Sequence, residues 1–115
     1  MSEAHGYGLL FTVLMAGYDT NAQTYFNGLY NYYTAHPSSI NPYLMSWKQN
    51  SSFQNIEGED SATDGDMDIA FALLLAHRQW GSAGAVNYLQ AENNIIGAIM
   101  DNEINQTQWT IRQGD

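Results

Sequence analysis

The chain has 115 residues, which fits one ordinary domain and no more, and 44% of them are hydrophobic, enough for a packed core. Acidic residues outnumber basic ones by 12 to 3, so the formal net charge is −9. Too few cations are present to displace counterions from nucleic-acid phosphates or to bind an anionic membrane surface, and the absence of cysteine excludes disulfides and thiolate metal sites.

The first predicted helix contains residues 9–16, a run that is apolar on nearly every side and therefore predicts a helix buried all round. No basic region precedes this run, so it predicts no signal peptide, and it falls short of the roughly 18 apolar residues of a membrane span. The second predicted helix, residues 22–35, carries the one-sided apolar stripe of a surface helix. That stripe consists of Ala22, Tyr25, Phe26, Leu29, Tyr30 and Tyr33.

Residues 38–61 form a long irregular stretch that is rich in Ser, Asn, Pro and Gly. One short extended piece is predicted at residues 44–48. Loops of this length inside a compact domain are usually functional or disordered. Trp47 and Phe53 lie within the stretch and argue against disorder, which favours a functional loop.

The third predicted helix spans residues 66–79, and its middle, residues 69–76, is again apolar on all sides. The fourth, about residues 84–101, is amphipathic, and residues 102–115 are polar with no predicted structure. The expected buried side of the fourth helix consists of Val86, Tyr88, Leu89, Ile95, Ile96 and Ile99.

The helices thus alternate between buried and amphipathic, which predicts an all-α fold of inner and outer helix pairs, as in a toroid. Two pairs do not close a ring, because repeat architectures generally need three or more units to bury their faces. The sequence therefore predicts part of a larger assembly. A four-helix bundle is the alternative, and it would show four amphipathic helices.

Two carboxylate clusters precede the all-apolar runs. Glu3 lies among small residues at the start of the chain, where it either serves chemistry or compensates the dipole of a helix. The second cluster contains Asp64, Asp66 and Asp68. A calcium loop is excluded there, because starts at Asp60 or Asp64 place Phe71 or Leu75 at the twelfth position. The structural explanation is a helix start with Thr63 as its cap, and no metal site is predicted.

These segments carry a family resemblance. Residues 2–8 (SEAHGYG) resemble the S-E-G-x-G-Y-G segment of glycoside hydrolase family 8, residues 62–80 match the signature stretch of that family, and residues 44–48 resemble its L-M-x-W-K segment. The family includes cellulases, lichenases, chitosanases and xylanases. The resemblance implies an (α/α)6 barrel, of which residues 1–115 would supply about a third, as two inner/outer helix pairs with both ends truncated.

The resemblance also implies roles for individual residues. Glu3 matches the general acid, Asp64 matches the signature aspartate at the cleavage point, and Trp47 matches an aromatic residue that stacks on a glucosyl ring. Tyr7 and Thr63 fall within the same matched segments and are predicted to contact the substrate. Ala4 departs from the pattern, since the family has glycine there. The family's catalytic base, an aspartate farther along the chain, has no counterpart after residue 109.

An inverting glycosidase uses one protonated and one ionised carboxyl group, about 6.5–9.5 Å apart, to leave room for water. The acid must hold its proton near neutral pH, and a neighbouring negative charge such as Asp64 would favour this. The resemblance therefore implies endo-acting, inverting hydrolysis of β-1,4-linked glucan, without cofactor, by a secreted enzyme that is monomeric at full length. The alternatives are a chitosanase of the same family or a glycan-binding fragment without catalysis. The specific match argues against a purely structural helical domain.

Overall fold

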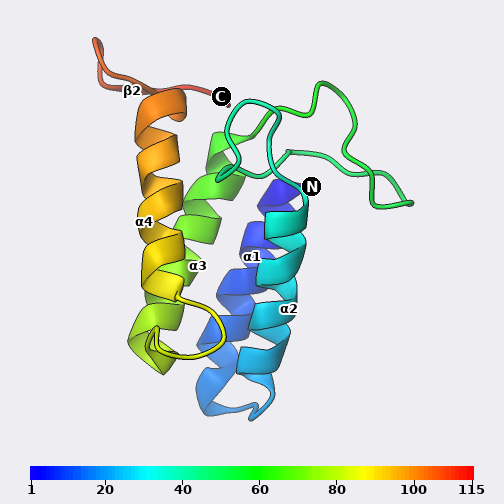
Figure 1. Cartoon of the computed structure of the whole chain (residues 1–115), viewed down its shortest axis with the longest axis vertical. Coiled ribbons are helices and arrows are strands. Elements are labelled where there is room, and N and C mark those ends of the chain that lie inside the picture. The colour runs from blue at the N-terminus through cyan, green and yellow to red at the C-terminus, as the bar shows by residue number, and fades with distance from the viewer.

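The computed structural model describes all 115 residues and is mostly helical. Four α-helices stand in a row in the order α4, α3, α1, α2 (Figure 1). The molecule is correspondingly flat, with extents of 41 × 34 × 19 Å. Its elements are α1 (Ser2–Leu14), η1 (Met15–Gly17), α2 (Ala22–Ala35), α3 (Thr63–Trp80), α4 (Tyr88–Ala98), η2 (Ile99–Glu103), β1 (Ile104–Asn105) and β2 (Thr110–Ile111). None of the helices combines the length and hydropathy needed to cross a bilayer.

Helix α1 begins at Ser2, so the segment of residues 2–8 forms its first turns rather than preceding it as expected. No side chain caps this helix. Instead, the backbone N–H of Ser2 donates to the carbonyl oxygen of Trp47 at 2.9 Å. The first N–H groups of a helix lack partners within it, and here the long loop supplies one from outside.

Helices α1 and α3 pack side by side, so the two all-apolar runs, residues 9–16 and 69–76, belong to neighbouring helices. Their contact is closest at two glycines. A Cβ atom on Gly65 would lie 2.8 Å from the backbone nitrogen of Glu3, and one on Gly6 would lie 2.7 Å from Cβ of Asp68. Because glycine has no Cβ atom, these two residues allow the backbones of α1 and α3 to come into contact at their N-terminal ends.

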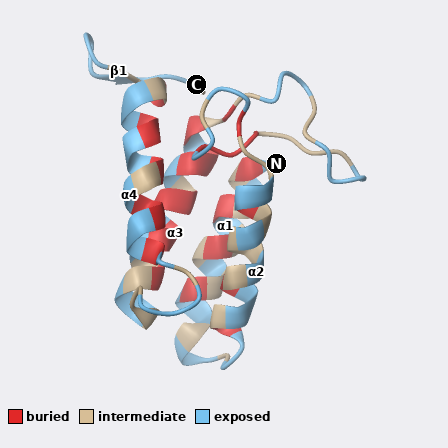
Figure 2. Ribbon diagram, viewed as in Figure 1, coloured by how far each residue is buried: buried red, intermediate tan, exposed pale blue.

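The expectation that both helices are buried all round is wrong for these 115 residues. Figure 2 shows the buried residues on the facing sides of the helices. Phe11 and Leu14 of α1 are 68% and 69% exposed, and Phe71 and Leu74 of α3 are also exposed. The spacing of apolar residues along a helix predicts how many of its faces are suited to burial. Within this chain, only one face of each of these two helices is covered by neighbouring helices. Tyr25, Leu89 and Ile96, expected on buried sides, are likewise exposed.

The core joins the two helix pairs through aromatic side chains. Phe26 of α2 meets Tyr88 of α4 edge to face at 5.5 Å and Trp80 of α3 at 5.4 Å between ring centroids. The hydroxyl of Tyr88 donates to Oδ1 of Asn27 at 2.5 Å, so its polar end is satisfied within the core.

The loop between α2 and α3 lies at the end of the molecule where α1 and α3 begin (Figure 1). Leu44 and Met45, in the predicted extended piece, are fully buried, and Pro37 and Met45 form an isolated antiparallel bridge. Phe53, by contrast, is 68% exposed, so it does not anchor the loop by burial.

The tail, for which no structure was predicted, forms the two-stranded hairpin β1–β2 and then returns to α3. The carbonyl of Gln113 accepts the N–H of Thr63 at 3.1 Å. Thr63 is therefore the first residue of α3 and not its cap, which is Ala62, and its hydroxyl makes no capping bond. A backbone carbonyl from the tail takes the place of the expected side-chain cap.

Candidate active site

A cavity of about 460 Å³ opens where α1 and α3 begin. Four segments that are distant in sequence meet around it: the start of α1, the loop at Trp47, the start of α3 and the strand β2 with the tail. Its lining consists of Met1, Ser2, Glu3, Trp47, Ala62, Thr63, Asp64, Met67, Ile111, Arg112 and Gln113. Four of the five predicted site residues are in this set, and Tyr7 is the exception.

Glu3 and Asp64, which lie about 60 residues apart in the sequence, line the same cavity. The close approach at Gly65 explains why, since it brings the first turns of α1 and α3 together. Asp68 lies one turn farther along α3, and its pKa is affected by both groups. Burial raises its pKa, and the negative charges of Asp64 and Glu3 raise it further.

Tyr7 lies one turn after Glu3 on α1, and its hydroxyl donates to Oε1 of Glu3 at 3.2 Å. The pKa of Tyr7 is raised, first by this hydrogen bond and then by the charge of Glu3. Oε2 of Glu3 makes no hydrogen bond within the chain. Tyr7 is thus a neighbour of the candidate acid rather than part of the cavity wall.

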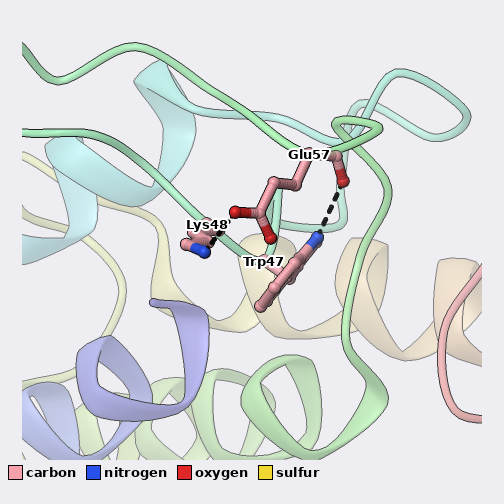
Figure 3. Close-up of polar contacts among 3 residues, drawn as sticks. All are labelled: Trp47, Lys48 and Glu57. Carbon is pink, nitrogen blue, oxygen red and sulfur yellow. Dashed lines mark hydrogen bonds and ion pairs between the residues drawn. The ribbon is translucent and has the colours of Figure 1, made fainter.

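The orientation of Trp47 is set by the loop that follows it (Figure 3). Its indole N–H donates to the carbonyl oxygen of Glu57 at 3.1 Å. The Glu57 carboxylate pairs with the ammonium group of Lys48, which lies 5.2 Å from the Trp47 ring centroid. One residue therefore holds both the ring and its neighbouring cation, a role that no motif marks in the sequence.

Sequence reasoning missed part of the lining, chiefly Met67, Ile111, Arg112 and Gln113. Arg112 is one of only three basic residues in the chain. Its backbone N–H donates to the carbonyl of Glu103 at 2.7 Å, and its guanidinium donates to the carbonyl of Asn102 at 3.1 Å. The tail has no hydrophobic period, so only the folded chain reveals that it reaches the cavity.

No group of three or more His, Cys, Asp or Glu side chains is placed to hold a metal ion. The functional groups of the cavity are the carboxyl groups at the N-terminal ends of α1 and α3, one aromatic ring and one guanidinium group. Carboxyl groups beside an aromatic platform suit the binding and acid–base cleavage of a sugar chain.

Comparison with known proteins decides the family, because Glycosyl hydrolases family 8 matches residues 1–114. The chain belongs to glycosyl hydrolase family 8. A beta-glucanase of Niallia circulans is 72% identical over the whole of this chain, which covers 28% of that protein. The apo structure of a beta-1,3-1,4-glucanase from Paenibacillus sp. X4 superposes with a TM-score of 0.97 at 74% identity, over 98% of this chain and 30% of that one.

A more distant structure confirms the fold class. Rex8A from Paenibacillus barcinonensis is only 20% identical but superposes with a TM-score of 0.83 over 98% of this chain and 32% of its own. The four helices are therefore inner and outer members of part of an (α/α)6 barrel. The chain spans less than a third of the length of each of these relatives. This explains the flat row of helices and their exposed apolar sides.

Proposed function

We propose that this chain is part of the catalytic domain of an inverting endo-glucanase that cleaves β-1,4-linked glucan, with Glu3 as the general acid. The observation that carries the proposal is the meeting of Glu3, Asp64 and Trp47 in one cavity. The names of the two relatives above, a beta-glucanase and a beta-1,3-1,4-glucanase, favour β-glucan as the substrate class.

The geometry around Glu3 suits a general acid. Glu3 and Asp64 line the same cavity, and the charges of both raise the pKa of the neighbouring Asp68. Tyr7 occupies Oε1, so Oε2 is free to face a leaving oxygen. Asp64 would hold the sugar at the cleavage point, and Trp47 would stack against the apolar face of a pyranose ring. The base that activates water would come from outside these 115 residues.

The acidic lining also suits a cationic polysaccharide, which keeps chitosan as the alternative substrate. Arg112 in the same wall favours the neutral glucan. A non-catalytic glycan-binding role is the other alternative. Because polymeric glucan does not enter cells, we also propose that the complete enzyme acts outside the cell, as a monomer.

The test uses a chimaera in which residues 1–115 replace the matching segment of the Paenibacillus sp. X4 glucanase. Glu3→Gln keeps the shape of the side chain but removes the proton, so turnover should fall by roughly 10²–10⁴-fold or more with glucan binding nearly unchanged. Asp64→Asn should lower turnover and binding together. Reducing ends released from barley β-glucan and chitosan measure turnover, and calorimetry measures binding.

Asp101→Asn is the control, because Asp101 is exposed and does not line the cavity. Full turnover by the Glu3→Gln variant would contradict the assignment of the acid. Faster cleavage of chitosan than of β-glucan would instead select the alternative substrate.

A further inference from the structure

A second pair of carboxyl groups lies behind the cavity wall. Asp66, in the first turn of α3, and Glu103, at the end of η2, are both fully buried, and neither lines the cavity. Each has one oxygen with a donor of its own. The N–H of Met45 donates to Oδ1 of Asp66 at 2.8 Å, and the hydroxyl of Ser61 donates to Oε1 of Glu103 at 2.6 Å.

The other two oxygens, Oδ2 of Asp66 and Oε2 of Glu103, are buried without a hydrogen bond, and so is the hydroxyl of Thr63, which is close enough to Glu103 to lower its pKa. The two carboxyl groups also lie within hydrogen-bonding reach of one another. Two ionised carboxylates in contact would repel each other strongly in this buried environment, and Oδ2 of Asp66 would keep no partner. A single proton between them removes one charge and gives both oxygens a partner.

No cation neutralises this pair. The charged group that faces both carboxyls is Asp115, which is itself negative, and the phenol of Tyr33 faces Asp66 from α2. Of the chain's three Lys and Arg residues, Lys48 is paired with Glu57, and the guanidinium of Arg112 is bonded to the carbonyl of Asn102. The third, Arg78, lies in the last turn of α3, whereas Asp66 lies in the first.

We propose that Asp66 and Glu103 share one proton at neutral pH, and that this pair positions the α3 side of the cavity. The electrostatics agree with the geometry. Burial raises the pKa of Asp66 to about 9, against the lowering effect of the Met45 N–H, and Glu103 adds to the rise. Burial also raises the pKa of Glu103, whereas hydrogen-bond donors on Ser61, Asp66 and Thr63 lower it, so within the pair the proton belongs more to Asp66.

The pair ties together the segments that form the wall. Asp66 is two residues after Asp64 in the same helical turn. Glu103 bonds the Ser61 side chain and, through its backbone carbonyl, the N–H of Arg112. The carboxylate of Asp115 belongs to the same hydrogen-bond network, because it accepts the N–H of Ser61 at 2.8 Å. Loss of the shared proton would therefore loosen Asp64 and Arg112, both of which line the cavity.

The sign of the pH effect follows from linkage. An unfolded Asp loses its proton near pH 4, whereas folded Asp66 keeps it to about pH 9. Between these values the folded state holds about one more proton than the unfolded state. The unfolding constant should then rise roughly tenfold per pH unit from this pair, and the stabilisation is lost as the pH passes through the folded value.

The decisive variant is Asp66→Asn with Glu103→Gln in the chimaera, since two amides can bond to each other without a shared proton. Between about pH 6 and about pH 8, the rise of its unfolding constant should be shallower than that of the parent by about tenfold per unit. Asp101→Asn, on the same η2 turn as Glu103, should keep the parent's slope. Equal slopes in the double variant and the parent would overturn the shared proton.

Infrared difference spectroscopy of the unsubstituted chimaera, with 13C-labelled aspartate and glutamate, covers the case in which the double variant does not fold. A buried protonated carboxyl should be present at pH 7, and its absence would overturn the proposal. Dependence of the parent's stability on added divalent cations or chelator would also overturn it, because a bound ion would then hold the pair.

The positioning role rests on the proposed function and has its own readout. Near pH 9 the parent's KM for β-glucan should rise before kcat falls, and the double variant should lack this rise. A KM that follows the same pH course in both proteins would overturn the positioning role alone. Failure of the Glu3→Gln test would overturn the proposed function and leave the unfolding slopes unaffected.

Discussion

At the scale of single residues, the carboxyl of Glu3 has one hydrogen-bonding neighbour within the chain. Tyr7 donates to Oε1, which leaves Oε2 without a partner. The raised pKa of Tyr7, caused first by its bond to Glu3 and then by the charge of Glu3, reports the same contact from the other side. We therefore expect Tyr7 to orient the candidate acid.

Tyr7→Phe tests this contact in the chimaera. Without the phenol, the Glu3 carboxyl loses the donor that orients it, so kcat should fall while glucan binding changes little. One hydrogen bond contributes about 0.5–1.5 kcal/mol, so the fall in kcat should be roughly two- to tenfold. Tyr18→Phe is the matched control, because Tyr18 is 87% exposed. An unchanged kcat would mean that Tyr7 does not influence the acid.

At the scale of elements, the sequence predicted what repeats along a helix and missed what depends on distant partners. All four helices were predicted from their apolar spacing, and the inner pair was placed correctly. The start of α1 was missed because Ser2 finds its acceptor in Trp47, far along the chain. The structure of the tail and the burial of Glu103 were not predicted for the same reason. Their positions depend on contacts with Ser61 and Thr63 rather than on any local sequence pattern.

The contact between α1 and α3 gives a prediction at this scale. Gly65→Ala would place a Cβ 2.8 Å from the backbone nitrogen of Glu3, so the two helix starts must separate. We expect a loss of about 1–3 kcal/mol in unfolding free energy, with lower kcat because Glu3 shifts.

Gly97→Ala is the matched control, since a Cβ at Gly97 of α4 meets nothing within 4 Å. It should raise stability by about 0.5–1 kcal/mol, because alanine is the better helix former. Denaturant unfolding compares the two variants. A Gly65→Ala variant as stable and as active as the parent would show that the close approach is unnecessary.

At the scale of the whole molecule, the sequence predicted more burial than these residues can provide. Residues 9–16 and 69–76 have the all-round apolar character of inner barrel helices, yet Phe11, Leu14 and Phe71 lie exposed. Membership of an (α/α)6 family resolves the difference, because the chain covers only 30% of the length of the Paenibacillus sp. X4 glucanase. The pattern was right about the fold, because an inner helix of a complete (α/α)6 barrel has neighbours on more than one side.

Because the chain forms only part of a barrel, the chemistry of the isolated 115 residues is limited as well. An inverting mechanism needs a base about 6.5–9.5 Å from the acid to activate water. The acidic groups at or beside the cavity are already committed in our assignment: Glu3 donates the proton, Asp64 holds the sugar, and Asp68 is a partly buried neighbour whose pKa is raised. The 115 residues alone should therefore release no reducing ends from barley β-glucan or chitosan, whereas the chimaera should release them. Clear turnover by the isolated chain would place a base within it, and Asp64→Asn would then identify or exclude the first candidate.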